Sequence, residues 1–241
     1  MRAETRHQLK EDKFSRATIG AAEATVHWTV EHQSKLIAAA IAAVVLIAIA
    51  AGGWYYLNQQ DAKASADLGA AVRTMDAPVV PAGTPAEPGM LTFSSSKDRS
   101  TAARQQLQSI VEKYPHTRSA DFARYFLGLT SAQLGDNPAA EADLQRVASS
   151  SNADLSALAK MALASVYRST NRPKQAIDIY NQLIAKPTLS VGKTTAQLEL
   201  AATYQASQQP LDAKRTYEQI QKENPATEVA QIATQKLQEL K

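Results

Sequence analysis

Alanine recurs at a nearly fixed spacing through the C-terminal half of the chain, and this spacing constrains the fold more than any other feature. Ala103, Ala140, Ala176 and Ala213 lie 36 or 37 residues apart. A large apolar residue follows each alanine after four positions, and an aliphatic residue follows after three more: Leu107 and Ile110, Leu144 and Val147, Tyr180 and Leu183, and Tyr217 and Ile220. Residues spaced i, i+4 and i+7 lie on one face of a helix. The sequence therefore predicts the same amphipathic helix four times.

A second repeated feature is a small residue that follows a leucine, twelve residues before each of the last three alanines. The pairs are Leu127-Gly128, Leu163-Ala164 and Leu200-Ala201, and the position three residues after each small residue holds Ser131, Tyr167 or Tyr204. Small residues let two helix axes approach closely, and the neighbouring large side chain fills the adjacent groove. Each unit is therefore predicted to contain two packed helices.

The prolines agree with this register. Three of them fall in the first turn of the second helix of a unit, where proline is tolerated, namely Pro138, Pro173 and Pro210. Three more fall just after a second helix, where the chain must turn, namely Pro115, Pro187 and Pro225. One register therefore explains every proline after residue 100.

An uncharged apolar segment, residues 36–57, precedes the repeats. About 22 helical residues with a rise of about 1.5 Å span roughly 33 Å, which matches the roughly 30 Å hydrocarbon core of a bilayer. Trp54, Tyr55 and Tyr56 lie at one end, where aromatic rings prefer the membrane interface. We therefore predict a transmembrane helix over residues 35–57.

Two alternatives remain for the apolar segment. A cleaved signal peptide would use Ala48-Ile49-Ala50 as its small-residue cleavage motif, although its apolar region is normally only about 7–15 residues long. A buried core helix of a soluble domain would carry a polar side, which this segment lacks. A membrane-spanning helix explains both the length and the uniform apolarity.

Basic residues are distributed unevenly around the apolar segment. The residues before it include Arg2, Arg6, Lys10, Lys13, Arg16 and Lys35, whereas only Lys63 and Arg73 lie between it and residue 97. Cytoplasmic flanks of membrane helices carry the excess of positive charge. We therefore predict that residues 1–34 form a cytoplasmic tail and that the C-terminal half lies across the membrane.

Between the apolar segment and the repeats, the composition changes. Residues 58–75 favour a juxtamembrane helix. Residues 76–100 contain four prolines, two glycines and a run of serines, which predicts a Pro/Ser-rich linker without regular structure. The predicted repeat domain covers residues 101–241. It begins with a half unit, Thr101–Tyr114, and ends with a capping helix, Ala226–Leu240.

Composition and motifs argue against catalysis and nucleic-acid binding. The chain has no cysteine, and its net charge of +3 includes no run of more than two basic residues. Val191–Thr194 ends like a phosphate-binding loop, but Pro187 stands where that motif needs glycine. His27 and His32 are five residues apart and do not share a helix face. We therefore predict no catalytic residue, metal site, cofactor, small-molecule substrate or nucleic-acid partner.

The paired helices, with their alanine, aromatic and terminal proline markers, resemble the tetratricopeptide repeat family. The units are slightly longer than the usual length of about 34 residues, and Ser131 replaces an aromatic marker. The resemblance implies an all-α fold in which one transmembrane helix is followed by a right-handed solenoid of tetratricopeptide-like helical hairpins. It also implies a chain that binds other proteins rather than an enzyme.

A cytoplasmic tail, one membrane helix and a short repeat array together resemble the YfgM-like ancillary subunits of the bacterial SecYEG translocon. This resemblance implies a scaffold in the inner membrane whose repeats face the periplasm, near the secretion channel and periplasmic chaperones. A second hypothesis is an assembly or coordination factor for an envelope complex in cell division or outer-membrane biogenesis. A third, an enzyme, would need a convergent set of titratable groups.

In such an array, the first helix of each hairpin lines the concave side. Eight residues there are predicted to face a partner, and we call them the first-helix face: Phe122, Tyr125, Leu129, Leu158, Met161, Arg168, Leu198 and Gln205. A groove of Tyr, Leu and Met suits an amphipathic or extended peptide segment. The alternative for Phe122, Leu129 and Leu198 is that they pack in the core.

Overall fold

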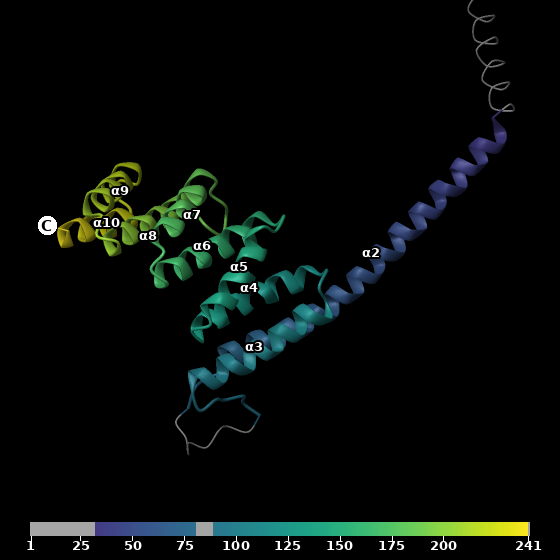
Figure 1. Cartoon of the computed structure of the whole chain (residues 1–241), viewed down its shortest axis with the longest axis horizontal. Helices are drawn as coiled ribbons and strands as arrows, with labels where there is room; N and C mark the ends of the chain where they lie inside the picture. The colour runs from purple at the N-terminus through teal and green to yellow at the C-terminus, as the bar shows by residue number, and fades with distance from the viewer. Residues whose placement is uncertain (1–31, 81–88, 241) are drawn as a thin grey trace, which may run out of the picture. The chain divides into compact units, whose positions relative to one another are not determined.

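The computed structural model describes residues 32–80 and 89–240. The fold of these residues is all-α, as predicted, and their only β feature is an isolated bridge between Val79 and Phe93. Nearly all of the predicted tail and the middle of the predicted linker lie outside the described residues. The helices, labelled in Figure 1, are α2 (Gln33–Asp76), α3 (Ser96–Lys113), α4 (Arg118–Gln133), α5 (Asn137–Ala148), α6 (Ala153–Ser169), α7 (Pro173–Ala185), α8 (Lys193–Ala206), α9 (Pro210–Glu223) and α10 (Glu228–Glu239).

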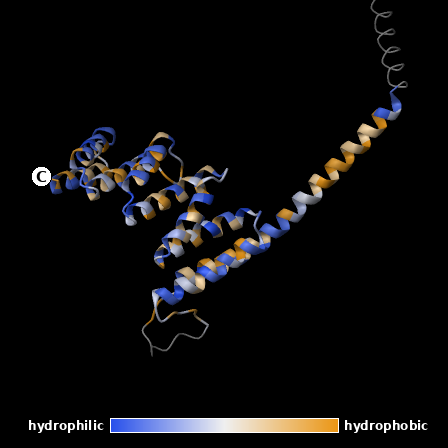
Figure 2. Ribbon diagram, viewed as in Figure 1, coloured by the Kyte–Doolittle hydropathy of each residue, from blue (hydrophilic) through white to orange (hydrophobic). Residues whose placement is uncertain are grey.

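The chain divides into two compact units after Tyr56, so that α2 contributes to both. The first part of α2 is apolar and exposed, and Figure 2 shows it as a run of orange. Its most apolar window has a mean hydropathy of 2.6 and contains no buried residue. By length and composition, this helix can cross a membrane, as the sequence predicts. The helix continues unbroken beyond the predicted boundary at residue 57.

The second part of α2, residues 57–76, belongs to the same compact unit as the helices that follow. Ala64 and Ala71 are fully buried, in a cluster with Leu107 of α3 and Leu127 of α4. This part of α2 therefore packs as the first helix of a hairpin whose second helix is α3. The half unit predicted at Thr101 is completed by a helix that precedes the proline-rich segment.

Two aspartates fasten the second part of α2 to its neighbours. Asp61 Oδ1 accepts a hydrogen bond from the backbone N–H of Ser119 at 2.9 Å. Asp67 Oδ2 accepts one from the Tyr114 hydroxyl at 3.2 Å. Burial, together with this bond to Asp67, raises the pKa of Tyr114 above its ordinary value. These bonds join α2 to the end of α3 and the beginning of α4.

The segment between α2 and α3 is paired at its two ends. The backbone N–H of Val80 donates to the carbonyl oxygen of Phe93 at 2.9 Å, and the N–H of Phe93 donates to the carbonyl oxygen of Pro78 at 3.1 Å. The stretch predicted as a linker over residues 76–100 therefore connects the two helices of the first hairpin.

Helix α3 begins five residues before the predicted start of the repeat domain. Ser95 is its N-cap, because its hydroxyl oxygen accepts a hydrogen bond from the backbone N–H of Asp98 at 3.0 Å. The same serine donates to the Asp98 carboxylate at 2.7 Å. The hydrogen bonds that the hydroxyl groups of Ser95 and Ser94 donate to this carboxylate hold the pKa of Asp98 below its ordinary value. The serine run, interpreted as linker, therefore starts a helix.

The remaining helices pack in chain order as the hairpins α4/α5, α6/α7 and α8/α9, and α10 packs on α9. All four marker alanines, Ala103, Ala140, Ala176 and Ala213, are fully buried. The large residues four positions later, Leu107, Leu144, Tyr180 and Tyr217, are at most 2% exposed. Helices α5, α7 and α9 each carry proline in the first turn. The predicted repeat register is confirmed.

The turn inside each of these three hairpins contains one residue with a left-handed backbone. These residues are Gly135 (φ 81°), Asn171 (φ 57°) and Gln208 (φ 60°), which recur with the repeat period. Glycine adopts this conformation freely and asparagine adopts it readily, whereas most other residues lose about 1 kcal/mol. The turn therefore strains the backbone at Gln208.

Helices α4 and α5 approach closely at Gly128. A Cβ atom at this position would lie 2.7 Å from Cγ and 2.9 Å from Cδ2 of Leu144, which is itself fully buried. In the next two units, Ala164 and Ala201 occupy this register position, with tyrosine where Leu144 stands. The glycine therefore makes room for a branched leucine where the other units place a flat ring.

Candidate protein-binding face

The eight residues of the first-helix face lie on α4, α6 and α8, the first helices of three successive hairpins. Helix α4 also contacts α6 directly, so these two first helices are neighbours. Phe122 is 37% exposed, and the other seven residues are half-buried. None of the eight is fully buried, so each keeps some surface that a partner can cover.

Helix α4 contributes an aromatic pair. The rings of Tyr125 and Phe126 have centroids 5.3 Å apart and an interplanar angle of 57°. Tyr125 packs against the core of the middle hairpins, and Phe126 packs against the core of the first hairpin. Burial raises the pKa of Tyr125. Phe126 was missed in the sequence because helical register assigns it to a neighbouring face, although its ring contacts Tyr125.

Helix α6 contributes Leu158 and Met161, which pack on the same core cluster as Tyr125. Tyr204 of α8 touches this cluster and also the core of the last hairpin, where Leu198 packs. The structure therefore connects four members of the first-helix face through adjoining apolar clusters. Tyr204, which the sequence identified only as a repeat marker, links the two clusters.

Arg168 of α6 forms an ion pair with Glu199 of α8. The distance from Nη1 to Oε2 is 2.9 Å, and the side chains are 33% and 41% exposed. An ion pair this exposed adds little to stability, about 0–1 kcal/mol. The sequence identified Arg168 as a lone charge on the face. The structure shows that it is paired, with a residue 31 positions away that helix register alone does not reveal.

Three members of the first-helix face stand apart from these clusters. Phe122, Leu129 and Gln205 are absent from the apolar clusters formed by the described residues. Gln205 is polar and half-buried, and Phe122 has the largest exposed fraction of the eight. The structure therefore connects Tyr125, Leu158 and Met161 more closely than it connects these three residues.

A polar network joins successive hairpins away from the first-helix face. Both terminal nitrogens of Arg172 donate to the Glu141 carboxylate, at 3.2 and 2.5 Å. The Arg172 guanidinium also lies 4.4 Å from the centre of the Tyr167 ring. Gln145 Nε2 donates to the Tyr167 hydroxyl at 3.0 Å. The hydrogen bond from Arg172 holds the pKa of Glu141 below its ordinary value.

The pKa of one carboxyl group, Asp143, is raised, whereas that of Glu141 is lowered. Burial raises the pKa of Asp143, and the Arg124 guanidinium, 3.0 Å away, offsets part of this rise. The pair joins α4 to α5 and leaves both side chains less than 20% exposed. Among the described residues, no group of three His, Asp or Glu side chains is arranged to hold a metal ion. The arrangement is that of ion pairs between packed helices.

Two models of known protein families match the chain. A family model described as a tetratricopeptide repeat-like domain matches residues 27–186, and one described as a tetratricopeptide repeat matches residues 195–227. The first match includes the apolar part of α2 and the hairpins up to α7, and the second covers α8 and α9. Comparisons with curated proteins and with solved structures found no match.

Proposed function

Because the chain belongs to the tetratricopeptide repeat-like domain family, whose repeats mediate protein-protein interaction, we propose that it is a membrane-anchored scaffold that binds a polypeptide through the first-helix face. The apolar part of α2 is the proposed anchor, in contact with the lipid bilayer through residues 35–57. The hairpins from residue 57 onward are the proposed binding array.

The observation that carries this proposal is the set of half-buried apolar side chains on neighbouring first helices. Tyr125, Leu158 and Met161 are held by one core cluster but remain partly exposed. Burying a whole Leu or Met side chain stabilises a complex by about 1.5–3 kcal/mol, so covering the exposed part contributes about 1 kcal/mol each. Arg168 is neutralised by Glu199. The face therefore favours an apolar or amphipathic segment over a charged one.

We place the repeats in the periplasm, with the N-terminus in the cytoplasm and the apolar helix in the inner membrane. The excess of Lys and Arg before residue 36 supports this orientation. The resemblance to the YfgM-like translocon subunits supports a role near protein translocation and periplasmic chaperones. A C-terminal fusion to alkaline phosphatase, which folds only in the periplasm, tests the orientation: an active fusion supports it, and an inactive fusion contradicts it.

In vivo photocrosslinking tests the binding face. A photoreactive amino acid replaces Tyr125 or Met161, and a matched control replaces Leu211, which is 70% exposed on α9. We expect crosslinks to translocon subunits or periplasmic chaperones from positions 125 and 161 but not from 211. Crosslinks confined to a division or outer-membrane assembly complex would support the alternative, a factor for envelope assembly. Equal crosslinking from all three positions would refute binding through the first-helix face.

A further inference from the structure

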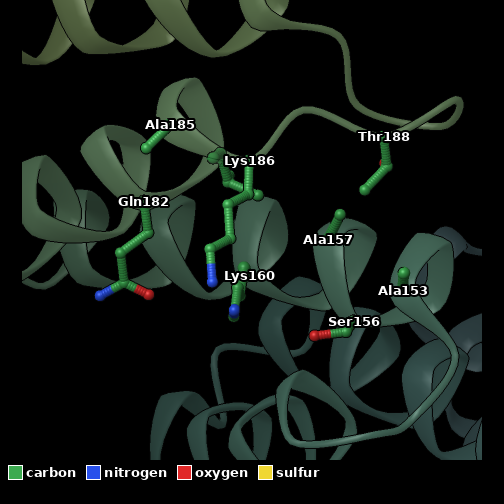
Figure 3. A pocket seen from close by; sticks show the side chains of 9 residues that line it. Ala153, Ser156, Ala157, Lys160, Gln182, Ala185, Lys186 and Thr188 are labelled. Atoms are coloured by element: carbon green, nitrogen blue, oxygen red, sulfur yellow. The ribbon is translucent and has the colours of Figure 1, made fainter.

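A cavity of about 330 Å³ opens between the first half of α6 and the end of α7. Figure 3 shows the residues that line it, and we call it the lysine pocket. Its apolar wall includes Ala153, Ala157 and Leu183, and its polar side includes Lys160 and Lys186. The cavity is large enough for one or two side chains but small for a whole cofactor.

The lysine pocket lies on a different side of α6 from the first-helix face. Lys160 follows Leu158 by two residues, which rotates it by about 200° around the helix axis. The α6 residues that line the pocket share this side, because Ala153, Ala157 and Lys160 follow one another at intervals of four and three. A ligand in the pocket would therefore leave Leu158 uncovered, whereas Met161, four residues after Ala157, borders the pocket side.

The two lysines have no partner for their charges. Neither ammonium group makes a hydrogen bond or an ion pair with the part of the chain that the structure describes. In the view of Figure 3, the side-chain nitrogens of Lys160 and Lys186 both lie on the side away from Ala153 and Thr188. Asp154, the acidic residue of α6, forms no ion pair with either lysine, and its Oδ1 accepts a hydrogen bond from the backbone N–H of Ser190 at 2.9 Å. That bond holds the loop that carries Thr188, another residue of the pocket.

A structural role explains only one of the two lysines. Lys186 is the C-cap of α7, where a cation is favourable at the negative end of the helix dipole. Lys160 lies in the middle of α6 and is half-buried, so the helix dipole does not account for it. Both lysines line one cavity, so an anion bound there would meet two positive charges.

We propose that the lysine pocket binds an acidic side chain, aspartate or glutamate, of a partner polypeptide. The carboxylate would lie between Lys160 and Lys186, and the aliphatic part of the segment would contact Ala157 and Leu183. The lysine ammonium group is a compact charge, so it pairs with a carboxylate without the planar two-bond geometry of arginine. The apolar wall suits the carbon atoms next to a carboxylate better than it suits a fully hydrated phosphate. This second site goes beyond the proposed function of the first-helix face.

The test measures binding of a fluorescein-labelled hexaglutamate peptide to the full chain in nonionic detergent micelles, by fluorescence anisotropy at low salt. Lys160→Met and Lys186→Met remove the charges but keep the side-chain stems. Lys174→Met is the matched control, because Lys174 is exposed on the same helix α7 and does not line the pocket. Ala153→Phe narrows the pocket at an exposed position without changing the charge.

We expect the double lysine variant to weaken hexaglutamate binding about tenfold, the combined effect of two exposed charge pairs. Ala153→Phe should also weaken it, and Lys174→Met should change it less than about twofold. Absence of binding to the native chain, or an equal loss with Lys174→Met, would overturn the proposal. Displacement by inorganic phosphate at a lower concentration than by N-acetylglutamate would assign the pocket to phosphate and would also overturn it. Because the probe is a free peptide, the result is independent of what the first-helix face binds.

Discussion

Substituting Gly128 with alanine adds one methyl group where α4 and α5 approach, and two effects then oppose each other. Alanine is more favourable than glycine inside a helix by about 1 kcal/mol. However, the new Cβ would lie 2.7 Å from Cγ of Leu144, whereas carbon atoms in favourable contact are about 3.5–4.0 Å apart. The substitution therefore forces an overlap of roughly 1 Å unless the helices separate.

The environment of Leu144 sets the size of this effect. The side chain is fully buried, and its Cγ clashes as well as its Cδ2, so rotation about χ2 alone does not remove the overlap. Overpacking of this kind costs about 1–3 kcal/mol. Taking a cost near 3 kcal/mol and subtracting the helix gain, we expect Gly128→Ala to destabilise the array by about 2 kcal/mol. Gly69→Ala is the control, because its nearest neighbour would be Arg73 Nη1 at 3.8 Å.

Urea unfolding of the full chain in detergent, followed by circular dichroism at 222 nm, measures both variants. Gly128→Ala should lower the free energy of unfolding by about 2 kcal/mol, and Gly69→Ala should raise it by about 0.5–1 kcal/mol. In a Leu144→Ala background, Gly128→Ala should lose its cost, because the clashing atoms are gone. A Gly128→Ala chain as stable as the native one would refute the reasoning, and so would an undiminished cost in the Leu144→Ala background.

Three further predictions use the same unfolding assay. The Glu223 pKa is lowered to about 2, first by the hydrogen bond from Gln219, so its contribution to stability is present above pH 4.5 and is lost as the pH falls towards 2. Glu223→Gln should therefore flatten the loss of stability across that range; an unchanged acid profile would contradict this cause. Gln208→Gly should stabilise the chain by about 1 kcal/mol by relieving the left-handed backbone, and a destabilised variant would show that the side chain matters more than the strain. Asp61→Ala should destabilise the array by about 1 kcal/mol, because the buried N–H of Ser119 loses its acceptor; no effect would argue against α2 as the first helix of the array.

The repeat register was predictable because it depends on local spacing. Helix periodicity predicts that Ala140 and Ala176 are buried. The proline in the first turn of α7 is predictable because proline lacks a backbone N–H. These properties act within a few residues of one another. They can therefore be inferred from a single sequence without knowledge of the tertiary contacts.

The sequence did not predict the first hairpin, for a different reason. Its first helix, residues 57–76, is continuous with the apolar span and is separated from α3 by the proline-rich segment. The regular spacing between first and second helices is therefore lost at this point. The local sign is a stripe on one helix face, formed by Ala64, Leu68, Ala71 and Met75 at spacings of four, three and four. Composition predicted a juxtamembrane helix over residues 58–75, without indicating that it packs on α3.

The chemistry between hairpins was the least predictable part. Arg168 and Glu199 are 31 residues apart, and Lys160 and Lys186 line one pocket from two different helices. Such contacts depend on the angle and offset at which helices pack, which residue spacing does not determine. The sequence therefore identified the helix that carries each side chain but not its partner across the helix interface.

The central claim is that the first-helix face of a membrane-anchored array holds a polypeptide, and recovery of co-purified partner tests it most directly. Met161→Asp places a charge on that face, and Leu211→Asp places the same charge on an exposed site of α9. With unchanged helix content in both variants, Met161→Asp should reduce the yield of co-purified partner at least tenfold, because an unpaired carboxylate would have to be desolvated at the contact. Leu211→Asp should leave the yield unchanged. Equal yields from the two variants would contradict the claim.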